Sequence, residues 1–284
     1  MEEDAVLFLV LTVVCSVLVS VIIRINEGRD GDRQVVAAAN YVMATLLSYA
    51  AIRLNGGSID TGWILAGAGL GIGFVAGFLL MMKGIREIGL AIPTSAARLS
   101  MLIPVIGSVI VFDERPTTLK IVGIFVGLLA FLLLGLSQRQ SRPLIEQHVG
   151  PGGAMILILL FMTVGATDFG MKILIAAGVG MDPLAFVIFS SAAIVCWGLV
   201  ILQRRKIRAR DLSLGALLGV PNFLSVLFLL LALRELEASS VFPAVSTGAV
   251  VLVNLVAALF WRERPNRPAA IGLALAVIAV ALLS

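Results

Sequence analysis

Long apolar runs alternate with short clusters of charged, glycine and proline residues along the whole chain. A helix that crosses the hydrocarbon layer of a bilayer needs about 20 mostly apolar residues. The pattern predicts ten membrane-spanning helices, at residues 5–23, 35–54, 62–82, 88–111, 118–136, 154–176, 183–202, 212–233, 238–260 and 268–283. Most connections between them hold only a few residues, so we expect no extramembrane catalytic or regulatory domain.

The composition agrees with a protein whose solvent is lipid. Hydrophobic residues make up 60% of the 284 positions and charged residues 13%, whereas soluble domains are about 45–50% apolar and about 25% charged. Mean hydropathy is +1.09. The net charge of +4 is spread over loops without interleaved aromatic residues, so it does not indicate a nucleic-acid partner. We expect an all-α integral membrane protein.

The second half of the chain repeats the first. Asp113-Glu114-Arg115-Pro116 precedes Gly123, and Arg262-Glu263-Arg264-Pro265 precedes Gly272 at the same spacing from Arg-Pro, 149 residues later. Pro93 recurs as Pro243. The repeats are expected at 1–140 and 154–284, joined by a linker at 141–153. A unit of five spans enters the membrane from opposite sides in its two copies, and such inverted repeats around a central cavity are a device of transporters.

Lysine and arginine predict the orientation, because they stay on the cytoplasmic side of a membrane. The regions after the odd-numbered spans hold 15 of these residues and those after the even-numbered spans hold 5, with Arg98 inside a span making the 21 of the chain. This bias predicts a multi-pass protein of the cell (inner) membrane with both termini on the non-cytoplasmic side.

Arg98 is the first candidate for substrate binding, because a charge inside a membrane is costly and usually faces a cavity or a partner. It lies near the middle of the fourth span. A guanidinium there can hold a carboxylate or phosphate through two parallel hydrogen bonds. The alternative is a structural role, in a salt bridge or at helix-end carbonyls.

Asp168 in the sixth span is the candidate for proton coupling, since a carboxyl in low dielectric titrates nearer to neutral pH. Two other roles remain open. It lies four residues before Lys172 on one helix face, so it can simply neutralise a lysine that extends to the interface. It can also pair with Arg98.

Uncharged polar residues inside the spans are further candidates for substrate contact, although bonding to a neighbouring helix is the commoner role. They are Asn40, Tyr41, Ser95, Asn222 and Asn254. Pro93 and Pro243 each remove a backbone hydrogen bond near the start of a helix. Interrupted helices at matching positions of two repeats indicate a midplane binding site, so we expect helix breaks at these two prolines.

The titratable residues do not suggest catalysis. His148 is the single histidine and lies in the linker, while Cys15 and Cys196 lie in apolar runs and are typical of buried small hydrophobic residues. We therefore expect neither a metal site nor a cofactor. An intramembrane enzyme would need a nucleophile–base pair or a metal cluster at membrane depth, which this pattern does not favour.

The Glu-Arg-Pro elements with their spaced glycines resemble the helix 4–5 and 9–10 junctions of the drug/metabolite transporter superfamily, and in particular its EamA-type branch. The resemblance covers nearly the whole chain. It implies two inverted five-helix repeats around a central cavity, to which Arg98, Asp168, Asn222 and Asn254 would be well placed. Relatives in this superfamily carry amino acids, nucleotide sugars or other small metabolites, often outward. Ten-helix members commonly have cytoplasmic termini, whereas the charge bias here predicts the reverse.

These observations predict a secondary transporter that moves a small polar or amphipathic metabolite, amino-acid-like or an organic anion, by alternating access. Its expected partners are that substrate, the lipid bilayer and, as a candidate coupling ion, the proton. A chain with both repeats can act as a monomer or a homodimer. The competing interpretation is a non-transporting membrane scaffold or channel-like subunit.

Overall fold

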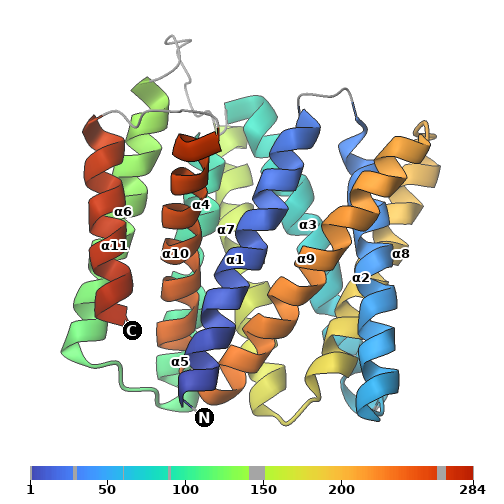
Figure 1. Ribbon diagram of the computed structural model, residues 1–284, viewed down its shortest axis with the longest axis horizontal. Helices are drawn as coiled ribbons and strands as arrows, with labels where there is room; N and C mark the ends of the chain where they lie inside the picture. Colours follow the sequence, from blue (N-terminus) through green and yellow to red (C-terminus); the bar gives the residue numbers. More distant parts are fainter. Residues whose placement is uncertain are drawn as a thin grey trace. The chain divides into compact units, whose positions relative to one another are not determined.

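The computed structural model describes residues 2–27, 31–59, 61–88, 91–140, 151–260 and 267–283. These residues form a helical protein (Figure 1). The helices are α1 (Glu2–Glu27), α2 (Arg33–Asn55), α3 (Ile64–Ile88) after a short 3₁₀ turn at Thr61–Trp63, α4 (Ala91–Leu99), α5 (Leu102–Phe112), α6 (Thr118–Gln140), α7 (Pro151–Ala176), α8 (Met181–Leu202), α9 (Ala209–Glu235), α10 (Ala238–Phe260) and α11 (Arg267–Leu283).

The ten apolar runs each correspond to helix, which confirms the all-α membrane class. Within the described ranges, eight segments are long and apolar enough to cross a bilayer, and Thr118–Leu133 and Arg267–Ala279 are shorter apolar helices. The fourth span, Ile92–Phe112, is built from two helices, α4 and α5, rather than one. Its counterpart in the second half of the chain is the single continuous helix α10.

Local sequence explains where α2 begins and ends. Asp32 accepts the backbone N–H of Gln34 at 2.9 Å, which satisfies one of the unpaired donors at the helix start. At the other end, Gly56 takes a left-handed conformation with φ 70°, which glycine adopts without steric cost and which terminates many helices. The next residues therefore leave the helix direction, and the second span ends there.

Two compact units make up the chain, and each contains helices from both halves of the sequence. Unit 1 is Met1–Val75 with Gly170–Glu235, and unit 2 is Ala76–Phe169 with Leu236–Ser284. The division runs through α3 and α7. In unit 1, α2 packs against α8 and α9, and α1 packs against α9. In unit 2, α6 packs against α11, and α10 packs against both α5 and α11 (Figure 1).

Glycines allow a close contact between α2 and α9 in unit 1. A Cβ atom added at Gly215 of α9 would collide with the Val36 carbonyl of α2, and one at Gly219 would lie 2.7 Å from the Asn40 carbonyl oxygen. The two glycines are four residues apart and therefore share one face of α9. Small residues at this spacing let helix backbones approach each other closely in lipid.

Two contacts between connections of unit 1 agree with alternate crossing of the membrane. Asn55 donates to Asp182 at 2.6 Å and joins the connections after the second and sixth spans. Arg205 donates to Asp32 at 3.4 Å and joins those after the first and seventh. Even-numbered connections thus contact even-numbered ones, and odd contact odd, as ten consecutive crossings require.

Candidate functional site

The helix break in the fourth span lies at Ser100–Met101, between α4 and α5. Pro104 accounts for it. Proline has no N–H to donate to the carbonyl four residues earlier, and its ring clashes with that carbonyl; here the carbonyl is that of Ser100. The Ser100 carbonyl accepts instead from the N–H of Ile103, at 3.0 Å. The chain therefore turns tightly in the middle of the span.

Pro93 and Pro243, the expected sites of interruption, do not coincide with a break. Pro93 is the third residue of α4, where a missing N–H is tolerated because the first turn has no intrahelical acceptor to reach. Pro243 is buried inside α10, which runs unbroken from Ala238 to Phe260. The matching prolines thus leave the helices continuous, and the interruption occurs in one repeat only.

Helix α7 packs directly on the break. A Cβ atom added at Gly165 would lie 2.7 Å from the Ser100 carbonyl oxygen and 2.5 Å from the Ile103 side chain. No other residue type fits here without displacing the backbone of the break. Asp168 is three residues further along α7 and therefore lies on the same face as Gly165.

Arg98 and Asp168, whose pairing was one of the roles left open by the sequence, both lie in unit 2. Arg98 is in the last turn of α4, immediately before the break. The two charges are close enough to interact, and both side chains are partly exposed. Ser95 lies on α4 one turn before Arg98 and is also partly exposed. The fourth span and α7 therefore present a cation and an anion beside a helix end.

Lys172 has a separate partner. Its ammonium group donates to the carbonyl of Leu233 near the end of α9, at 3.2 Å. A cation at the carbonyl end of a helix is stabilised by the helix dipole. The charge interaction that the structure gives Asp168 is with Arg98. Of the three roles open to Asp168, its interaction with the Arg98 charge favours pairing with Arg98 over neutralisation of Lys172.

Asn254 lies on α10 and donates through Nδ2 to the carbonyl of Val250 in its own helix, at 2.8 Å. Its second amide N–H and its carbonyl oxygen Oδ1 are left for another ligand. Two buried hydroxyls of the same helix, those of Ser240 and Thr247, have no hydrogen-bond partner. Thr247 packs where α10 meets Gly127 of α6, so it belongs to a helix contact.

The remaining candidates belong to unit 1. Asn40 is buried on α2 at the contact with Gly215 and Gly219, and its carbonyl oxygen Oδ1 has no hydrogen-bond partner. Tyr41 is buried against Phe189, with ring centroids 6.4 Å apart. Asn222 lies on α9 directly after Pro221 and is partly exposed. These three residues are thus part of a different unit from Arg98.

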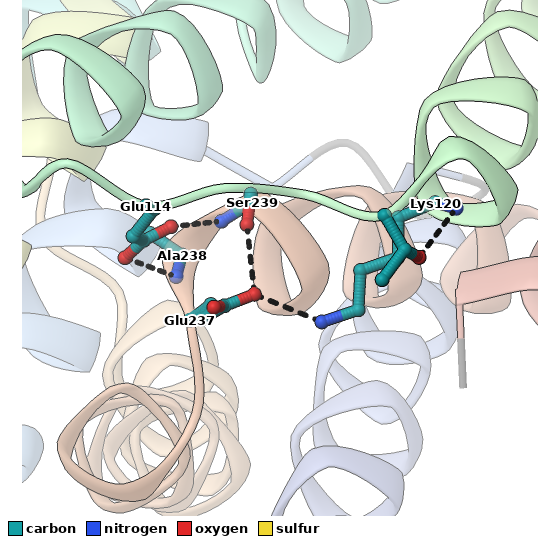
Figure 2. Close-up of polar contacts among 6 residues, drawn as sticks. Glu114, Lys120, Glu237, Ala238 and Ser239 are labelled. Atoms are coloured by element: carbon teal, nitrogen blue, oxygen red, sulfur yellow. Dashed lines mark hydrogen bonds and ion pairs between the residues drawn. The ribbon is translucent and has the colours of Figure 1, made fainter.

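A contact that the sequence did not predict fixes the start of α10. Both carboxylate oxygens of Glu114, in the connection between α5 and α6, accept backbone N–H groups, from Ala238 and Ser239 at 3.1 Å each (Figure 2). Beside it, Lys120 of α6 forms an ion pair with Glu237 at 2.9 Å. We call these two contacts the α10 clasp.

The α10 clasp contains a buried carboxylate that remains ionised. Burial raises the pKa of Glu114, but hydrogen bonds from the N–H groups of Ser239 and Ala238, with smaller contributions from the Ser108 and Ser239 hydroxyls, outweigh it and hold the pKa below its ordinary value. The first N–H groups of a helix lack intrahelical acceptors and carry partial positive charge. Glu114 supplies the missing acceptor from another part of the chain.

Among the residues that the structure describes, no three His, Cys, Asp or Glu side chains are grouped so as to hold a metal ion. Cys15 and Cys196 are buried free thiols. His148 and the segment Arg262-Glu263-Arg264-Pro265 lie outside the described residues.

The chain combines the architecture of a multi-pass membrane protein with two repeats and an interrupted helix at an intramembrane charge, which is the construction of membrane transporters. The model of the EamA-like transporter family matches it twice, at residues 4–136 and 151–284. The protein belongs to the EamA-like transporter family, and so to the drug/metabolite transporter superfamily.

Two further similarities cover most of the chain. An uncharacterised protein of Haemophilus influenzae is 27% identical over 271 residues, which is 91% of each chain. A crystal structure with 15% sequence identity has a TM-score of 0.82 and covers 99% of this chain and 96% of its own. The second likeness concerns the fold alone.

Proposed function

We propose that this transporter is a secondary carrier for a small polar or amphipathic metabolite, amino-acid-like or an organic anion, and that Arg98 binds the acidic group of the substrate. The observation that carries the proposal is the position of Arg98. It lies within the span, in the last helical turn before the break, partly exposed and beside an opposite charge. A fork of guanidinium donors there matches a carboxylate in geometry and in charge.

Asp168 gives the proposal a charge-balancing step. In the empty carrier, Asp168 offsets the charge of Arg98. A substrate carboxylate that binds Arg98 replaces Asp168 as its counter-charge. Asp168 then either takes up a proton or binds an ammonium group of the substrate. The first alternative couples transport to protons, and the second selects zwitterions. Alternating access would carry the loaded site from one face of the membrane to the other.

Transport into proteoliposomes tests this assignment. A panel of organic anions and amino acids is first screened for thermal stabilisation of the purified protein, because a ligand of the folded state raises its apparent stability. Uptake of the best compound is then compared for wild type, Arg98→Ala and Arg98→Lys, with Arg53→Ala at the exposed end of α2 as the matched control. Full transport by Arg98→Ala would remove the proposed role of this residue. Stabilisation by no compound would favour a scaffold.

We also propose that the protein lies in the inner membrane with both termini on the non-cytoplasmic side. Single cysteines at Ser58 and Gln203, in exposed connections after the second and seventh spans, serve as reporters. An impermeant thiol reagent applied to intact cells should label Ser58→Cys and should reach Gln203→Cys only after permeabilisation. The reverse pattern would assign the opposite orientation. Labelling of both from one side would contradict the crossing pattern itself.

A further inference from the structure

The connection between α8 and α9 is the most strongly basic part of the described surface. Five of the seven residues at 204–210 are Lys or Arg, namely Arg204, Arg205, Lys206, Arg208 and Arg210, and each is exposed. We call residues 204–210 the basic loop. The next acidic residue, Asp211, is 1% exposed and so contributes little to the surface. The loop therefore presents concentrated positive charge to its surroundings.

Apolar side chains accompany this charge. Ile207 inside the loop is 52% exposed, and Leu202, the last residue of α8, is 79% exposed. Since α8 is a membrane span that ends at Leu202, the basic loop begins where the chain leaves the hydrocarbon. Isoleucine among lysines and arginines at that depth matches the boundary between acyl chains and headgroups, where apolar side chains enter the lipid and cations remain at the surface.

The basic loop has a fixed conformation. Arg204 adopts a left-handed backbone conformation with φ 50°, and the N–H groups of Gln203 and Arg205 bond back to carbonyls at the end of α8. The Arg205 guanidinium reaches Asp32 at the start of α2, and Asp211 accepts the N–H of Asp32 at 3.4 Å. These contacts, all within unit 1, hold the backbone of the loop against the ends of α8 and α2.

We propose that the basic loop is a binding site for the headgroups of anionic phospholipids, such as phosphatidylglycerol. These lipids lie in the leaflet in which α8 ends, at Leu202. Clusters of four to eight Lys and Arg directly beside a membrane span attract anionic lipid, with about 1 kcal/mol for each cation near the surface. The exposed apolar side chains distinguish this occupant from a soluble anion, because only a lipid offers acyl chains next to its phosphate. The inference is independent of what the carrier transports.

The test uses the full-length protein in nanodiscs of phosphatidylcholine alone or with roughly one quarter phosphatidylglycerol. The triple variant Arg204→Gln, Lys206→Gln and Arg210→Gln keeps Arg205 and Arg208, which make other contacts. Its matched control is Arg53→Gln, Arg115→Gln and Arg234→Gln, which removes three exposed cations from even-numbered connections. The readouts are thermal stability and the retention of phosphatidylglycerol in native mass spectrometry.

Phosphatidylglycerol should stabilise wild type and the control alike. In the loop variant that stabilisation should vanish, and lipid retention should fall by roughly tenfold or more, while stability in phosphatidylcholine stays unchanged. Equal stabilisation of all three proteins would overturn the proposal. A second arm adds inorganic phosphate to the phosphatidylcholine nanodiscs. If phosphate reproduces the effect of the lipid, the loop takes soluble anions and the proposed lipid site is wrong.

Discussion

The fourth spans of the two repeats contain the same kind of sequence and yet have different structures. In the first repeat the span is broken between α4 and α5, and Arg98 lies at the break. In the second repeat α10 is continuous, and its start is held by the α10 clasp (Figure 2). Pro93 and Pro243 occupy matching positions and cause no break in either, so the matching prolines do not explain the difference.

One pair of positions does explain it. With Pro93 aligned to Pro243, Pro104 aligns with Asn254. Pro104 takes away the donor that would reach the carbonyl four residues earlier. Asn254 adds one, because its side chain donates to the corresponding carbonyl, that of Val250. The same site in the duplicated helix is thus weakened in one copy and reinforced in the other. The break is therefore found in the first-repeat copy of this helix and not in α10.

Substitutions at Asn254 and Pro104, made one at a time, should have the largest effects. Asn254→Pro introduces proline into an unbroken helix, and we expect a loss of about 3 kcal/mol in stability, measured by thermal unfolding in detergent. Pro104→Ala restores an N–H for the Ser100 carbonyl, and we expect higher stability with a lower turnover rate. Asn254→Leu is the control for loss of the amide. Unchanged turnover in Pro104→Ala would show that the break is not needed for transport.

Replacement of Arg98 should come next. Hydrogen bonds to charged groups contribute about 1.5–3 kcal/mol, so Arg98→Ala should reduce transport at low substrate concentration by about 10- to 100-fold. Arg98→Lys keeps the charge without the planar fork and should recover part of the loss. Initial uptake rates over a range of substrate concentrations separate binding from turnover. An equal defect in Lys and Ala variants would indicate that the fork, not the charge, is required.

Asp168→Asn should change the coupling of transport to a pH gradient. The amide has nearly the shape of the carboxyl group but cannot carry a proton between the two faces. We expect a pH gradient to stop driving accumulation, while exchange of substrate at equal pH continues. Counterflow and gradient-driven uptake by the same proteoliposomes measure the two activities. Proton-driven accumulation that persists in Asp168→Asn would exclude this residue as the coupling site.

The smallest effect should come from a change in the α10 clasp. Glu114→Ala leaves two helix N–H groups without an acceptor, at a cost of about 1–2 kcal/mol in stability. Because the pKa of Glu114 is lowered in the folded protein, its contribution is complete above its ordinary pKa and is lost as the pH falls through the lowered value. The difference between wild type and Glu114→Ala should therefore persist at neutral pH and shrink in acid. Glu114→Gln, which retains one acceptor oxygen, should lie between them.

The lengths of the apolar runs predicted the spans well, because the bilayer requires a similar length of each of them. The limits of α8, for example, were placed at 183–202 and lie at Met181–Leu202. The break was placed at the wrong prolines. Pro104 was visible in the sequence, but the pattern did not single it out. Pro93 and Pro104 are each the third residue of a helix, of α4 and of α5, and it is the helix start before Pro104 that lies in the middle of the predicted span.

The candidate site could be predicted in part. Arg98 and Asp168 were both conspicuous as intramembrane charges, but only the packing of Gly165 on the break brings α7 beside α4. The pairing of Glu114 with α10 could not be predicted. Its partners are backbone N–H groups some 120 residues away, and backbone groups leave no mark in a sequence. Tertiary contacts of this kind appear only when the helices are placed in space.

The interleaving of the two units has a consequence for biosynthesis. Helices α1 and α2 leave the ribosome early, but they pack against α8 and α9, which are made late. The first two helices therefore remain in the lipid without these packing partners until most of the chain has been translated. A chain cut between its halves would yield two fragments with unmatched faces. Each would depend on meeting the other before proteases or foreign helices reach those faces.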